Sequence, residues 1–154
     1  MTDKDILPPI EKVYEAFSAV ADGRVELKGE NQASVTSSDR AKQYTVTWTD
    51  NEFRSNDNAT YWQGYIGYPI IAVLIALGKI PCDKAAMHAL AGLNWKAINK
   101  QHQNDYKEAV ESVLSELAKQ GADTEKIKVE AGTIMNRLES LGITLKKPVR
   151  SSRQ

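Results

Sequence analysis

An uncharged run from Asn58 to Gly78 limits the folds open to this chain more than any other feature. Its second half, residues 69–77, is apolar at every position and begins with Pro69, a residue favoured in the first turn of a helix. A membrane-spanning helix needs about 20 predominantly apolar residues, and the amides and glycines of residues 58–68 leave a dense apolar stretch that covers less than half of a bilayer. No cluster of Lys or Arg flanks the run. We therefore expect a core helix that protein surrounds on every side, and no membrane span.

The residues before this run predict one helix and three strands. After Pro8 and Pro9, apolar residues recur at three- and four-residue spacing up to Gly23, which indicates an amphipathic helix. The period then changes to two, most clearly in residues 43–50, where aromatic and valine side chains alternate with threonines. With the turn-like segments KGEN and SSDR between them, these strands predict a three-stranded antiparallel meander over approximately residues 24–50. The polar segment DNEFRSNDN that follows is interpreted as a loop.

The residues after the apolar helix predict a helical C-terminal half. A short helix capped by Asp83 precedes a long helix that begins at Asn94 and continues to Gly121. A final helix follows that glycine and forms an antiparallel hairpin with the long one. The sequence therefore predicts an α+β fold with an N-terminal helix, a small meander, a buried apolar helix and a C-terminal helical hairpin. We expect a single domain at 1–145, with the meander at about 24–50 and the helical part at about 58–143, followed by a basic flexible tail at 146–154.

Charge and cysteine content limit the classes of protein that fit. The 154 residues contain 20 Lys and Arg and 20 Asp and Glu, so no overall field draws the chain to nucleic acid or to an anionic membrane. Cys82 is the only cysteine, which excludes an intrachain disulfide and fits a reducing compartment. The first residues are acidic and include two prolines, unlike a secretory signal. The expected location is the cytoplasm.

Aromatic residues gather in the first half of the uncharged run, at Tyr61, Trp62, Tyr65 and Tyr68. If this segment is helical, its three tyrosines lie on one stripe. Three interpretations stay open. The stripe packs on the sheet as core, or it is an exposed surface for a protein partner, or it forms the wall of a small-molecule pocket with Arg54 or His88 as a polar partner.

Residues 84–103 loosely resemble a helix-turn-helix with its turn at Gly92. The second helix would offer polar side chains to a major groove, namely Asn94, Lys96, Asn99, Lys100 and Gln103. Acidic residues follow in the same predicted helix and would repel phosphates. This charge balance favours an ordinary corner between two helices.

No catalytic or metal-binding set can be assembled from the sequence. His88 and His102 do not have the spacing of a metal-binding helix motif. Cys82 lies near a predicted helix start, where amide groups can lower the pKa of a thiol, but no base is placed beside it. We therefore predict no metal and no cofactor.

The patterns favour a small soluble module without catalytic activity that binds a partner or oligomerises. Its expected partner is another protein or a second copy of the chain. DNA binding through residues 84–103 is one alternative. An enzyme with an aromatic pocket around residues 61–68 is the other.

Overall fold

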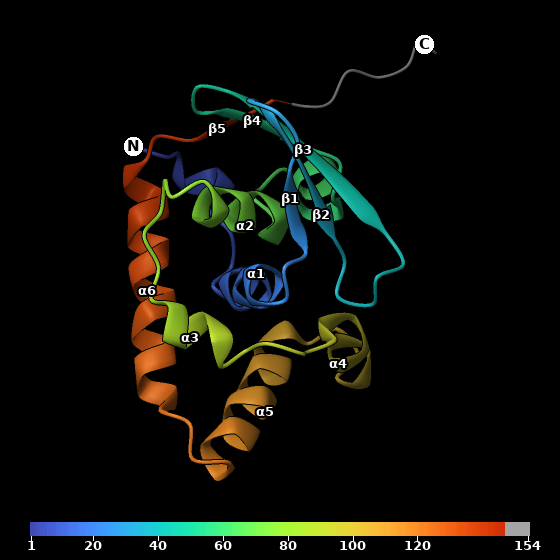
Figure 1. Ribbon diagram of the computed structural model, residues 1–154, viewed down its shortest axis with the longest axis vertical. Coiled ribbons are helices and arrows are strands. Elements are labelled where there is room, and N and C mark those ends of the chain that lie inside the picture. Colours follow the sequence, from blue (N-terminus) through green and yellow to red (C-terminus); the bar gives the residue numbers. More distant parts are fainter. Residues whose placement is uncertain (147–154) are drawn as a thin grey trace.

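Figure 1 shows the fold in a computed structural model, which describes residues 1–146. The predicted basic tail lies outside these residues except for Lys146. In chain order, the N-terminal part contains η1 (Lys4–Ile6), α1 (Glu11–Ala21), β1 (Val25–Leu27), β2 (Gln32–Thr36), β3 (Gln43–Thr49), β4 (Glu52–Ser55) and the short π-helix η2 (Ala59–Gln63). The remaining elements are α2 (Tyr68–Ala76), α3 (Lys84–His88), α4 (Trp95–Gln101), α5 (Tyr106–Lys119), α6 (Thr124–Ser140) and β5 (Thr144–Leu145).

The sheet has the strand order β1-β2-β3-β4-β5, so the predicted meander is present and is longer than expected. Strands β1 to β4 pair antiparallel, and β5 adds in parallel to β4. The prediction of a loop over residues 50–58 is wrong at β4. A two-residue turn with Asp50 at a positive φ of 53° reverses the chain. Phe53 is then buried and stacks on Trp48 with ring centroids 5.7 Å apart, so one aromatic residue holds a strand that is otherwise polar.

The predicted core helix is confirmed as α2. Pro69 lies in its first turn, and all side chains from Pro69 to Ile75 are buried, while Ala76 at the end is exposed. The helix contacts α1 and strands β1 to β4, so it lies between a helical layer and the inner face of the sheet (Figure 1). Among the helices that residues 1–146 form, none is long and apolar enough to cross a bilayer.

The long helix predicted from Asn94 to Gly121 is two helices, and this prediction is wrong. The chain leaves α4 through Gln103 and Asn104, whose φ angles are 51° and 62°. Asp105 then begins α5 by accepting a hydrogen bond from the N–H of Glu108 at 3.0 Å. Asn tolerates the left-handed region and Asp is a favoured N-cap, so these two residues end one helix and begin another although the apolar stripe continues. Figure 1 shows α4 and α5 running in different directions.

The C-terminal hairpin is confirmed, with α5 and α6 joined by a short turn at Gly121. The two helices diverge from this turn, and α3 contacts α6 near the body of the protein (Figure 1). The predicted cap of α3 is also present, because the Asp83 carboxylate accepts hydrogen bonds from the N–H groups of Ala85 and Ala86. The helical half therefore follows the expected order with one additional break.

The N-terminal end of the chain is fixed to the end of α6 by Thr2, which is 2% exposed. Its hydroxyl donates to the carbonyl of Leu138 at 2.6 Å and accepts from the N–H of Ile143 at 2.9 Å. Replacing Thr2 with the equally shaped valine would leave both partners buried without a hydrogen bond. We expect a loss of about 1–3 kcal/mol in the free energy of unfolding, measured by urea denaturation. Thr2→Ser keeps the hydroxyl and is the control, and equal stability of the two variants would contradict this role.

Candidate functional site

A cleft with a volume of about 230 Å³ lies where the N-terminal half of the chain meets α4 and the start of α5. Its walls come from α1, the start of β1, the β2–β3 hairpin, the turn before η2, the first residue of α2, α4 and the α4–α5 connection. Five charged residues line it, and these are Lys12, Glu15, Arg24, Asp57 and Lys96. Segments from both halves of the chain therefore converge on one cleft that carries five charged side chains.

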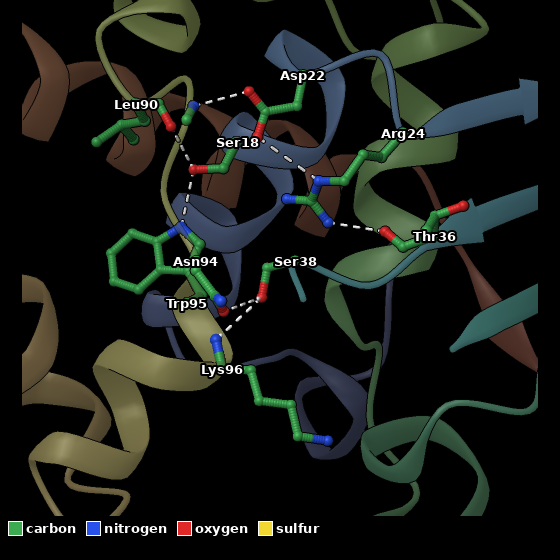
Figure 2. A network of polar contacts seen from close by, with 10 residues as sticks. Ser18, Asp22, Arg24, Thr36, Ser38, Leu90, Asn94, Trp95 and Lys96 are labelled. Carbon is green, nitrogen blue, oxygen red and sulfur yellow. Dashed lines mark hydrogen bonds and ion pairs between the residues drawn. The ribbon is translucent and has the colours of Figure 1, made fainter. Parts of the chain in front are cut away.

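The lining of the cleft includes Arg24, a positively charged residue that is only 4% exposed. Its Nη1 donates to the carbonyl of Thr36 at 2.7 Å, and its Nε lies 3.6 Å from a carboxylate oxygen of Asp22, beyond hydrogen-bond distance. The third nitrogen, Nη2, is buried and has no hydrogen-bond partner among residues 1–146. Figure 2 shows the guanidinium between Asp22 and Thr36, with the third nitrogen directed to neither of them.

The backbone around Arg24 holds this side chain in place. Helix α1 ends with Gly23 in the left-handed region at φ 67°, a conformation that glycine adopts without strain. The N–H of Arg24 donates to Ala19 at 2.9 Å, and its carbonyl accepts from Thr36 at 2.9 Å. The residue is thus fixed to the last turn of α1 on one side and to β2 on the other.

A polar network positions α4 across the cleft from the sheet (Figure 2). The Ser18 hydroxyl donates to the carbonyl of Leu90 at 2.7 Å and accepts from the indole N–H of Trp95 at 2.8 Å. Asp22 accepts from the N–H of Gly92 at 2.7 Å. Ser18 lies in α1 and Asp22 directly follows its last residue, so the C-terminal end of this helix fixes the α3–α4 connection and the buried face of α4.

The β2–β3 hairpin reaches the beginning of α4 from the other side through Ser38. Its hydroxyl accepts from the N–H of Lys96 at 2.9 Å and lies 3.4 Å from the side-chain oxygen of Asn94 (Figure 2). The neighbouring Ser37 donates to Asp39 at 2.6 Å and accepts from the N–H of Lys42. Both serine hydroxyls of the cleft are therefore used in holding its walls.

A second buried charge, Glu15 of α1, lines the cleft and is 7% exposed. Its Oε2 accepts a hydrogen bond from Asn99 at 3.3 Å and lies 3.9 Å from the ammonium group of Lys12. Burial raises the pKa of the Glu15 carboxyl above its ordinary value, while Lys12 and Asn99 act in the opposite direction. The cleft therefore contains a buried guanidinium group and a buried carboxyl group.

Tyrosine rings form part of the wall. Tyr44 and Tyr68 meet edge to face with centroids 6.3 Å apart. Burial raises the pKa of both hydroxyls, and the nearby Arg24 partly offsets this for Tyr68. Both hydroxyls are thus protonated at neutral pH and can donate hydrogen bonds.

The Asp57 carboxylate accepts hydrogen bonds from its own turn through both of its oxygens. One carboxylate oxygen accepts from the Ser55 hydroxyl, and the other accepts from the N–H of Thr60 at 3.2 Å. Gly67 packs so closely that an ideal Cβ there would be 2.0 Å from this second oxygen. We assign Asp57 to the support of the cleft wall.

The aromatic cluster predicted from the sequence is divided by the structure. Tyr68 lines the cleft, whereas Tyr61 and Trp62 contact each other with centroids 4.7 Å apart and Trp62 is 74% exposed. Tyr65 is half-buried and does not line the cleft. Arg54 lies on β4 beside Thr47 and lines a separate hollow of the sheet.

The residues predicted to face DNA are also divided. Asn94 caps α4 by accepting from the N–H of Ala97, and Asn99 is buried against Glu15. Lys96 lies on the cleft, while Lys100 and Gln103 are exposed outside it. DNA binding by this segment stays a prediction, as does oligomerisation.

Cys82 and the histidines lie away from the cleft. Burial raises the pKa of the Cys82 thiol to about 12, with the carboxylate of Glu130 adding to the effect. A thiol with this pKa is almost fully protonated at neutral pH and is a poor nucleophile. The Nδ1 atom of His102 lies 2.8 Å from the Oε1 atom of Glu108, and His88 is exposed.

Sequence reasoning missed the three charged residues that define the cleft, Lys12, Glu15 and Arg24. All three occupy positions that the patterns assign to the solvent side of a helix or to a turn. One signal was present, because Arg24 immediately follows the helix-ending Gly23 and precedes a strand, and such junctions bring side chains from two elements together.

Residues 5–144 match a family described as "Uncharacterised conserved protein UCP014422". The chain belongs to this family. The match covers the cleft together with every helix from α1 to α6, so the fold described above is that of the family region. No curated protein and no solved structure shows significant similarity to the chain.

Proposed function

We propose that this protein is a small-molecule-binding module without catalytic activity, and that its cleft holds a ligand with an anionic group at Arg24. The observation that carries the proposal is that Arg24, one of the residues lining the cleft, has a buried Nη2 without a hydrogen-bond partner among the described residues. A buried charged donor without a partner is costly, and a carboxylate or phosphate oxygen is the acceptor that satisfies it best. A bound anion would therefore complete the polar network of Figure 2.

Other groups of the cleft support an anionic ligand. Lys96 lies at the cleft with its side chain exposed, and within residues 1–146 no carboxylate lies within ion-pair distance of it. The protonated hydroxyls of Tyr44 and Tyr68 add neutral donors. Binding is favoured over nucleophilic catalysis, because both serine hydroxyls of the lining are committed to the walls and no histidine or cysteine of the described chain contributes to it.

The test is thermal unfolding of the protein against a panel of small carboxylates and inorganic phosphate at constant ionic strength. A ligand present at 100 times its Kd stabilises the folded state by about 2.7 kcal/mol, which gives a clear rise in Tm. Arg24→Lys is expected to weaken binding roughly 10- to 100-fold, because a hydrogen bond to a charged group contributes about 1.5–3 kcal/mol.

Lys96→Met provides a second variant at the exposed side of the cleft, and Lys100→Met on the same helix is its matched control outside the cleft. Lys96→Met is expected to weaken binding severalfold, with Lys100→Met unchanged. Stabilisation by no member of the panel would contradict the proposal. Equal binding by the wild type and all three variants would also contradict it.

A further inference from the structure

We infer that the ligand carries a cationic amino group as well as its anionic group, so that a small amino-carboxylate is bound between Arg24 and Glu15. This inference rests on the proposed function and adds the chemical class of the ligand. Two buried ionisable groups, the guanidinium of Arg24 and the carboxyl of Glu15, line one cleft, and each has unused hydrogen-bonding capacity. The geometry of Glu15 carries the second half of the argument.

The Glu15 carboxylate is incompletely satisfied by the protein. Among residues 1–146 its side chain accepts one hydrogen bond, from Asn99 at 3.3 Å. Burial raises the pKa of this carboxyl group, and a cationic group bound beside it would favour the ionised form, whose two oxygens offer about four acceptor sites. A further N–H donor from the cleft would therefore be favourable.

Lys12 does not fill this role at close range. Its ammonium nitrogen is 3.9 Å from Glu15, a distance beyond a direct hydrogen bond. The same nitrogen lies over the ring of Tyr106, 4.5 Å from the ring centroid, in a cation–π contact. Lys12 is thus shared between two partners at the edge of the cleft.

A purely anionic ligand would lie close to the Glu15 carboxyl group and disfavour its ionised form, because like charges in a buried site repel. A molecule with both signs avoids this cost, because its carboxylate pairs with Arg24 while its ammonium group pairs with Glu15. Charge complementarity of this kind selects ligands by rejecting those that leave a buried group unpaired. We therefore expect the cleft to discriminate between an amino-carboxylate and the same carboxylate without its amine.

The experiment compares matched pairs of probes by calorimetry, namely alanine with propionate, 4-aminobutyrate with butyrate, and glutamate with glutarate. The amino members differ in the distance between their ammonium and carboxylate groups. Binding of one pair is therefore sufficient for the comparison. The amino member of that pair is expected to bind at least 10-fold more tightly than its partner. Glu15→Gln keeps the shape of the side chain and an oxygen that can accept the hydrogen bond from Asn99. This variant is expected to reduce the preference for the amine to less than threefold. Glu11→Gln, one turn earlier on α1 and outside the lining, is expected to keep it.

The outcomes separate this inference from the function on which it rests. If carboxylates bind through Arg24 with no preference for an amine, the amino-carboxylate inference is overturned and the anion-binding function stands. If an amine preference persists in Glu15→Gln, the assignment of Glu15 is overturned. If neither member of any pair binds and phosphate also fails, both proposals fall. The comparison in the wild type alone decides the ligand class even if Glu15→Gln does not fold.

Discussion

Replacing Leu74 with alanine is expected to lower the free energy of unfolding by about 2–5 kcal/mol. Leu74 is fully buried in the middle of α2, where the helix lies between α1 and the inner face of the sheet. The substitution removes apolar contacts and leaves a cavity that a helix enclosed on all sides cannot close by moving. Small domains have a total stability of about 5–15 kcal/mol, so this loss would be a large share of it. Urea denaturation measures it directly.

Val129→Ala is the matched control, because Val129 lies on α6 with 68% of its surface exposed. This change is expected to stay within about 0.5 kcal/mol of the wild type. If Leu74→Ala were as mild as the control, α2 would not be the centre of the core, and the arrangement of layers described above would be contradicted.

Replacing Gly67 with alanine is expected to cost about 2–5 kcal/mol for a different reason, which is overpacking with the loss of hydrogen bonds. The backbone of Gly67 is extended at φ −87°, so alanine brings no backbone strain. The added Cβ would be 2.0 Å from the carboxylate of Asp57. Asp57 would have to move, and its contacts with Ser55 and Thr60 would be lost inside the protein.

This substitution also changes the cleft, since Asp57 and the two residues after it form one wall. The control is Gly132→Ala in α6, where an added Cβ meets no atom within 4 Å. Alanine is favoured over glycine in a helix interior, so Gly132→Ala is expected to stabilise the protein by up to about 1 kcal/mol. Opposite signs for the two changes support the close packing at Asp57, whereas equal stability would contradict it. Urea denaturation is again the measurement.

The elements with a strong apolar period could be predicted from the sequence. Helix α2 follows from an apolar run with proline at its start, and β3 follows from alternation of Tyr44, Val46 and Trp48 with threonines. In both cases several residues of one element are buried on the same face or on every face, and this produces a local pattern. Such an element can be predicted without knowing what packs against it. The sequence did not predict β4, because Phe53 is the only large apolar residue of this strand. Its burial depends on stacking against Trp48 of the neighbouring strand, which no local pattern reveals.

The candidate site was harder to predict because polar residues build it. Glu15 and Ser18 occupy α1 positions that an amphipathic pattern assigns to solvent, and they are buried against Leu90, Trp95 and Asn99 of the α3–α4 region. The position of α4 depends in turn on the break after His102, which was missed. Tyr68 was predicted as a site residue and does line the cleft, but its neighbours there are Tyr44 of β3 and Arg24 rather than Arg54. Long-range packing of this kind leaves no local period in the sequence.

NMR of the arginine side chain shows whether Nη2 of Arg24, which has no hydrogen-bond partner among residues 1–146, binds the anionic group of a ligand. Buried guanidinium N–H groups exchange slowly with water, and the Arg24 signals can be assigned by their loss in Arg24→Lys. During titration with the tightest ligand of the panel, we expect a saturable shift of the Arg24 guanidinium signals with the same Kd as calorimetry. Saturation of binding with those signals unmoved would contradict it.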